Sequence, residues 1–81
     1  MKYYIIKPSS SKIDDDLIKG LRSLDAAAIF VDDIKEADKC VLQKGWTKSK
    51  LAVSEYHMAK ENHIQCDEGY LYTDKYKVHL N

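Results

Sequence analysis

Glu55 is the residue of this chain whose type and position point most directly to chemistry. On a helical wheel, an apolar arc is formed by Leu51, Ala52, Met58 and Ala59. At 100° per residue from Leu51, Glu55 falls at about 40°, in the middle of that arc. A carboxylate on a core-facing stripe is costly unless it is paired, hydrogen-bonded or facing a cleft. Glu55 therefore suits a general acid or base, or an acceptor for a ligand hydroxyl. The alternative is a carboxylate at the stripe's edge that pairs with a lysine or a backbone amide.

The segment 43–49, which precedes this helix, is the second candidate for a ligand site. Helix N-termini attract anions through free N–H groups, and lysines at positions 44, 48 and 50 add positive charge. Gly45 allows backbone to approach a ligand closely, and Trp46 offers a surface on which a flat ring can stack. The glycine spacing is not that of a P-loop. The alternative is that Trp46 covers the core and the lysines are only solvated.

Short apolar runs and helical periodicities alternate along the chain and predict the elements that position these residues. The expected strands are 3–6, 27–31, 39–43, 64–66 and 70–72. A helix is predicted over 11–24, from the stripe of Ile13, Leu17, Leu21 and Leu24, with a cap from one of the serines at 9–11. A short helix is expected at 33–38, and a longer one from Thr47, as its cap, to about Asn62.

The order strand, helix, strand, short helix, strand, helix, strand indicates an α/β fold with a mostly parallel sheet of four to five strands. A turn is expected at 67–69, and the alternation of Tyr76, Val78 and Leu80 suits an edge strand or an oligomer contact. Ligands bind such sheets at the carboxyl ends of the strands. Here those ends are 7–11, 32–33 and 43–47, so the site is expected there.

Length and charge restrict the class of protein. The 81 residues predict one domain, 1–81, and so short a chain favours homo-oligomerisation. Thirteen basic and thirteen acidic side chains cancel, so extended nucleic-acid binding is not expected. The only apolar run near Met1 has four residues, which predicts neither a signal peptide nor a membrane span. A cytoplasmic protein with reduced thiols is expected.

The histidines, cysteines and tyrosines give weaker signals. His63 and Cys66 have a spacing that zinc tolerates, but no second tight pair completes four ligands, so neither a metal nor a cofactor is expected. Cys40 and Cys66 are expected in the core rather than as redox partners. The tyrosines at 56, 70, 72 and 76 favour packing or an oligomer interface over a stacking surface for single-stranded nucleic acid.

The stretch 37–59 resembles the nucleoside 2-deoxyribosyltransferase-like family, and most closely its small bacterial and phage members of unknown function. The elements that carry the resemblance are Ala37-Asp38, Gly45-Trp46, Ser49, Ala52, Glu55 and Ala59. They cover about a third of the chain in detail. The resemblance implies a small flavodoxin-like three-layer sandwich that binds nucleosides or nucleotides.

By the same resemblance, Glu55 is the nucleophile that attacks the sugar's anomeric carbon, or the acceptor of a ribose hydroxyl. Ser49 and the amides around it hold a phosphate or sugar oxygen, and Tyr3 or Tyr4 lies near the site. After the first strand the family usually has a glycine and a proline. This chain has Pro8 but no glycine there, and the hydroxyls of Ser9 and Ser10 are the donors expected instead.

The residues expected at the site are therefore Glu55 as the catalytic residue and, for ligand binding, Tyr4, Ser9, Ser10, Asp32, Gly45, Trp46 and Ser49. Two functions remain open. The first is a nucleoside- or nucleotide-binding domain, either a minimal N-glycosidic-bond hydrolase or transferase or a binder. The second is a phage- or mobile-element-type interaction protein that inhibits or sequesters a host component without catalysis. A homo-oligomeric domain in which Glu55 only pairs within the core is a third possibility.

Overall fold

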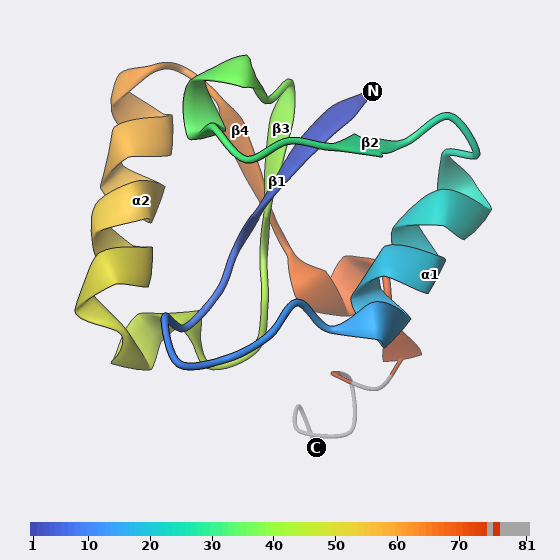
Figure 1. Ribbon diagram of the computed structural model, residues 1–81, viewed down its shortest axis with the longest axis horizontal. Coiled ribbons are helices and arrows are strands. Elements are labelled where there is room, and N and C mark those ends of the chain that lie inside the picture. Colours follow the sequence, from blue (N-terminus) through green and yellow to red (C-terminus); the bar gives the residue numbers. More distant parts are fainter. Residues whose placement is uncertain (75, 77–81) are drawn as a thin grey trace.

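The computed structural model describes residues 1–74 and 76. Within them the chain builds one parallel sheet from four strands, in the order β2-β1-β3-β4 (Figure 1). The strands are β1 (Lys2–Ile6), β2 (Ile29–Phe30), β3 (Lys39–Leu42) and β4 (Gln65–Glu68). This strand order and the parallel pairing are those of a flavodoxin-like α/β fold, which confirms the predicted class.

Two α-helices of the described chain, α1 (Asp15–Leu24) and α2 (Lys50–Glu61), cover opposite faces of the sheet and make three layers (Figure 1). Short 3-10 helices occur at η1 (Ile34–Glu36), η2 (Trp46–Lys48) and η3 (Gly69–Leu71). None of the helices in the described part of the chain combines the length and the apolar character that a membrane crossing requires.

The alternation of side chains along β1 explains how so short a chain has two cores. Tyr3 and Ile5 pack with Leu17 and Leu21 of α1. Ile6 points to the opposite face, where it packs in the same cluster as Ala52 and Ala59 of α2. Successive strand residues face opposite ways, so a strand covered on both faces has to be apolar throughout. Burial on both faces of the sheet therefore explains the continuous apolar runs in the sequence.

The first helix is shorter than the periodicity predicted. It begins at Asp15, and the cap is Asp14, whose side chain accepts a hydrogen bond from the amide of Asp16. The serines at 9–11 therefore do not cap it. Ile13 lies before the helix and Leu24 at its end, and both are exposed, so only Leu17 and Leu21 of the predicted stripe are buried. An Asp cap wins here because its carboxylate also complements the positive end of the helix dipole.

The second helix begins at Lys50, with Ser49 rather than Thr47 as its cap. The Ser49 hydroxyl accepts a hydrogen bond from the amide of Ala52, while Thr47 lies inside η2. The predicted end of the helix is confirmed, because Asn62 is the C-cap.

Three predictions for the later strands were wrong in detail. The fourth strand spans Gln65–Glu68, so the turn predicted at 67–69 is mostly strand. The strand predicted at 70–72 is instead the 3-10 helix η3. Gly69 permits this turn, because an added Cβ would lie 2.7 Å from the carbonyl oxygen of Leu42. In the predicted tail, Tyr76 is buried, and Val78 and Leu80 lie outside the described residues.

The edge of the sheet is also shorter than expected. The apolar run 27–31 contributes only the two-residue strand β2, and the helix predicted at 33–38 is reduced to η1. The carboxylate of Asp33 accepts a hydrogen bond from the amide of Lys35 and so caps η1.

Candidate functional site

Glu55 and Tyr4 are joined across the layer between α2 and β1. Tyr4 projects from β1 toward α2, and its hydroxyl donates a hydrogen bond to the Glu55 carboxylate. Burial raises the pKa of Tyr4 above its ordinary value, and the hydrogen bond and the negative charge of Glu55 raise it further. The tyrosine therefore stays a neutral donor at physiological pH. No other hydrogen bond and no ion pair involves Glu55 among residues 1–74 and 76.

The helical-wheel argument placed Glu55 nearer the core than the structure does. Ala52 and Ala59 are fully buried, but Leu51 is 57% exposed and Met58 41% exposed. The buried direction of α2 is therefore that of the two alanines, and Glu55 lies at its border, partly buried. The alternative of a carboxylate at the edge of the stripe is correct in position. Its partner, however, is a tyrosine hydroxyl rather than a lysine or a backbone amide.

Four of the predicted ligand-binding residues meet in one depression of about 630 Å³, which we call the serine pocket. Ser9 and Ser10 come from the loop after β1, and Gly45 and Ser49 come from the loop before α2. The lining also includes Pro8, Ser11, Lys44, Lys48, Lys50 and Leu51. Strand parallelism explains the meeting, because the carboxyl ends of β1 and β3 lie at the same edge of the sheet.

Ser49 ties the two loops of the serine pocket together. Its hydroxyl oxygen lies 3.3 Å from the amide nitrogen of Ala52 and 3.4 Å from that of Ser9, and accepts from both. Gly45 makes the turn at a φ of 89°, in the left-handed region. Three lysines line this pocket, and the N-terminus of α2 carries the positive end of the helix dipole. The chemistry of the pocket is that of an anion site with hydroxyl donors.

Tyr4 and Asp32 line a different depression, of about 180 Å³, on the side of β1 next to β2, which we call the edge pocket. Phe30, Ile13 and Lys7 complete most of its wall. Asp32 is exposed, and its charge contributes to the raised pKa of Tyr4, after burial and Glu55. Because Lys7 lines the edge pocket and the adjacent Pro8 lines the serine pocket, the two depressions flank the carboxyl end of β1.

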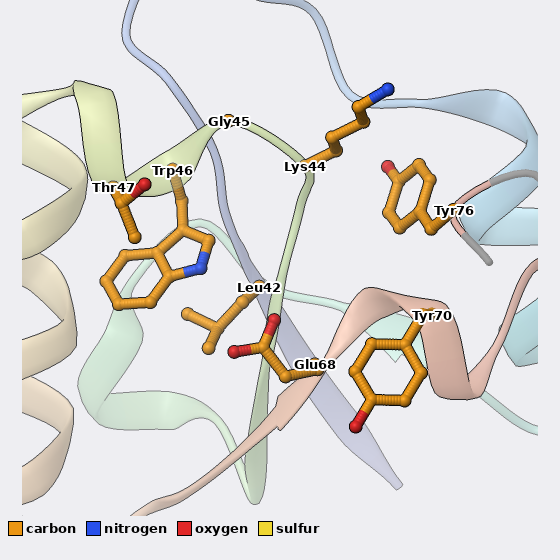
Figure 2. Close-up of a pocket in the computed structure, with 8 residues that line it drawn as sticks. All are labelled: Leu42, Lys44, Gly45, Trp46, Thr47, Glu68, Tyr70 and Tyr76. Carbon is orange, nitrogen blue, oxygen red and sulfur yellow. The ribbon is translucent and has the colours of Figure 1, made fainter. Parts of the chain in front are cut away.

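Trp46 faces a third pocket, of about 200 Å³, at the carboxyl ends of β3 and β4 (Figure 2). We call it the aromatic pocket; it is lined by Leu42, Lys44, Gly45, Trp46, Thr47, Glu68, Tyr70 and Tyr76. The indole is partly buried and contacts Tyr56 of α2, with ring centroids 4.9 Å apart. The predicted ligand-binding residues are thus distributed over three depressions. Trp46 lines a different pocket from Ser9, Ser10 and Ser49, although the two pockets share Lys44 and Gly45.

Gln43 holds the site together in a role that the sequence pattern did not reveal. It is 6% exposed, its side-chain nitrogen donates to the carbonyl of Lys12, and its oxygen accepts from the amide of Asp14. Both distances are 2.9 Å. The one signal in the sequence for this contact is a glutamine side chain directly after an apolar strand. Through it, the end of β3 fixes the start of α1.

The cysteines lie opposite each other on β3 and β4, and both are free thiols. Burial raises the pKa of Cys40 to about 12, and proximity to Cys66 acts in the same direction. A thiol of this kind is protonated at neutral pH and is a poor nucleophile or metal ligand. No group of three or more His, Cys, Asp or Glu side chains suited to a metal ion occurs in the described part of the chain.

Comparisons with known proteins found no relative. No family model matches the chain, and no curated protein and no solved structure matches it significantly.

Proposed function

We propose that this protein binds a nucleoside or nucleotide over the carboxyl end of β1 and presents Glu55 to the sugar. The observation that carries the proposal is the hydrogen bond from Tyr4 to Glu55. It holds a partly buried carboxylate with a neutral hydroxyl donor, and no ion pair with a cation involves this carboxylate among the described residues.

The serine pocket supports the anionic part of this ligand. Backbone amides at the start of α2 and the hydroxyls of Ser9 and Ser10 are donors for phosphate or sugar oxygens. Lys48 and Lys50 are exposed at its rim and add charge attraction. This is a local anion site in a chain whose net charge is zero.

The edge pocket supports the base. Phe30 and Tyr4 offer aromatic surface, and Asp32 is an acceptor for the N–H groups of a base. A ligand that reaches from the serine pocket to the edge pocket passes over Lys7 and Pro8. In this proposal the sugar lies between the two pockets, next to Tyr4, which lines the edge pocket and is the hydrogen-bond partner of Glu55.

Catalysis at this site would follow the chemistry implied by the resemblance. The Glu55 carboxylate attacks the anomeric carbon, a C–O bond forms, and the C–N bond to the base breaks with its electron pair on the base. The base takes a proton from solvent, and water or another base then cleaves the glycosyl ester. Tyr4 donates a hydrogen bond to one oxygen of the Glu55 carboxylate. The other oxygen has no hydrogen-bond partner among the described residues.

Thermal shift against a panel of nucleosides and nucleotides tests binding, with Glu55→Gln beside the parent. Glu61→Gln is the matched control, because Glu61 is an exposed glutamate of the same helix. A ligand that raises Tm for the parent and Glu61→Gln, and raises it less for Glu55→Gln, supports the proposal. Release of free base that is lost only in Glu55→Gln shows catalysis. If no member of the panel raises Tm, the proposal fails.

An interaction protein is the second candidate, and one surface favours it. Leu24, Ile29 and Met1 are all more than half exposed, at 71%, 57% and 53%. They are neighbours, because the amide of Ile29 donates to the Met1 carbonyl and the Met1 amino group pairs with Asp25. A copy of this chain or a host protein would cover this apolar surface. Light scattering of the parent and Leu24→Glu tests self-association, and pull-down with the same pair tests a host partner.

A further inference from the structure

The aromatic pocket has a composition that the proposed nucleotide site does not use. Its floor is the side chain of Leu42, which is 4% exposed, and its walls include Trp46, Glu68 and Tyr70. Leu42 and Glu68 are register partners on β3 and β4, so their side chains leave the sheet on the same face. The two strands therefore place an acceptor beside an apolar floor.

Two polar groups of this pocket have no partner among the residues that the structure describes. Neither the Glu68 carboxylate nor the indole N–H of Trp46 makes a hydrogen bond or ion pair with any residue of 1–74 or 76. Figure 2 shows the carboxylate of Glu68 and the nitrogen-bearing edge of Trp46 both turned toward the middle of the pocket. The pocket thus presents one acceptor and one donor above an apolar floor.

The position of the indole is set by packing. Trp46 stacks in a tilted arrangement on Tyr56, and the Lys60 ammonium lies 5.5 Å from the centre of the Tyr56 ring. This contact covers one face of the indole. A donor held in place in this way loses little conformational freedom when a ligand binds.

Charge decides between ligand classes. Glu68 is negative and Lys44 is positive, so the pocket favours neither a strong anion nor a strong cation. Figure 2 shows the Lys44 side chain extended away from Glu68. The remaining requirements are a flat apolar body, an N–H donor for Glu68 and an adjacent acceptor for the indole N–H. At about 200 Å³, the pocket is smaller than sites for drug-sized ligands, which run from ~300 Å³.

We propose that the aromatic pocket is a second ligand site, which binds a small neutral aromatic heterocycle carrying an amino group next to a ring nitrogen. The amino group donates to Glu68, and the ring nitrogen accepts from the Trp46 indole N–H. The ring packs over Leu42 and against Tyr70. This site involves neither Glu55 nor Tyr4, so it does not rest on the proposed function.

Adenine is the probe, because its amino group lies beside a ring nitrogen, and purine is the matched control without the amino group. Trp46 is the single tryptophan of the chain, so its fluorescence reports the pocket directly. We expect saturable quenching by adenine and at least ~10-fold weaker binding of purine, because a hydrogen bond to a charged acceptor is lost. Equal affinity for adenine and purine, or no saturable change, overturns the proposal.

Variants locate the site. Glu68→Ala should weaken adenine binding at least ~10-fold. Glu61→Ala, which removes an exposed glutamate elsewhere, should leave it unchanged. For Trp46→Phe, calorimetry replaces fluorescence, and weaker binding is expected. Loss of adenine binding in Asp32→Asn or Ser49→Ala, with Glu68→Ala unaffected, places adenine in the edge or serine pocket and overturns the proposal without removing the nucleotide site.

Discussion

The hydroxyl of Tyr4 donates to the carboxylate of Glu55, 51 residues later in the chain. This contact joins the first strand to the second helix on the face of the sheet that α2 covers. It is the one hydrogen bond of Glu55 among the described residues, so its energetic contribution can be measured by substitution at either end.

Tyr4→Phe should lower the free energy of unfolding by about 1–3 kcal/mol, because it leaves the partly buried Glu55 without its donor. The double variant Tyr4→Phe/Glu55→Leu should recover most of this loss, since it removes both polar partners. Urea denaturation of the parent, both single variants and the double variant measures the coupling. Additive effects of the two substitutions would contradict a direct interaction.

Gly20 should not tolerate alanine, although alanine normally favours an internal helical position. An added Cβ would lie 1.6 Å from the carbonyl oxygen of Tyr72, which is backbone and cannot rotate away. We expect Gly20→Ala to destabilise the fold by about 1–3 kcal/mol or more, in place of the usual gain of ~1 kcal/mol. Thermal denaturation measures this. Lys19→Ala, at an exposed position of the same helix, is the control and should be close to neutral.

Ser49→Ala should weaken both the helix and the proposed binding of an anion in the serine pocket. The substitution removes the cap of α2 and the contact with the Ser9 amide, and loss of such a cap costs about 1 kcal/mol. Ser54→Ala is the matched control, because Ser54 is exposed within the same helix. Chemical denaturation gives the stability, and the Tm increase at saturating inorganic phosphate gives the binding. A Ser49→Ala protein that phosphate stabilises as much as the parent would argue against a phosphate-binding role for Ser49.

The pair formed by Tyr72 and Asp67 predicts how stability depends on pH. The Tyr72 hydroxyl donates to Asp67 at 2.5 Å, and Lys39 lies 3.1 Å from the same carboxylate. Burial opposes ionisation of Asp67, but hydrogen bonds from Tyr72 and Gln65 and the proximity of Lys39 outweigh it, so the pKa of Asp67 is lowered. Burial and Asp67 together raise the pKa of Tyr72.

A carboxyl group whose pKa is lower in the folded than in the unfolded state stabilises the fold at any pH above its unfolded pKa of ~3.9. This stabilisation is lost as the pH falls through the folded pKa. A tyrosine whose pKa is raised in the folded state stabilises the fold fully at any pH below its unfolded pKa of ~10. This stabilisation is lost as the pH rises from there through the folded pKa. Unfolding free energy measured against pH should therefore decline at both ends. In Asp67→Asn both declines should be shallower; unchanged slopes would show that Asp67 is not linked to them.

Most of the architecture could be predicted from the sequence, because burial on both faces requires continuous apolar strands. Tyr3, Ile5 and Ile6 are an example, and the parallel α/β class follows from the alternation of such runs with helical stripes. Boundaries were less predictable. Neighbouring side chains compete to cap a helix, and Asp14 and Ser49 are the caps in place of the expected serines and Thr47.

The site was predictable in part for the same reason. Parallel strands bring their carboxyl ends to one edge, so Ser9, Ser10, Gly45 and Ser49 meet as expected. Trp46 could not be assigned to its pocket, because its partners Glu68 and Tyr70 depend on how the chain turns after β4. A strand was expected at 70–72, where the structure has the 3-10 helix η3, which begins at Gly69 beside the Leu42 carbonyl.

The sequence by itself determined the α/β class, the parallel sheet and the edge at which polar loops collect, since these follow from hydrophobic period and chain order. Tertiary structure decided which face of α2 is buried, that Glu55 meets Tyr4, and how the loops divide into three pockets. The physical reason is distance along the chain. Periodicity reports which side of an element is apolar, whereas the partner of a polar side chain is set by the packing of elements that lie far apart in sequence.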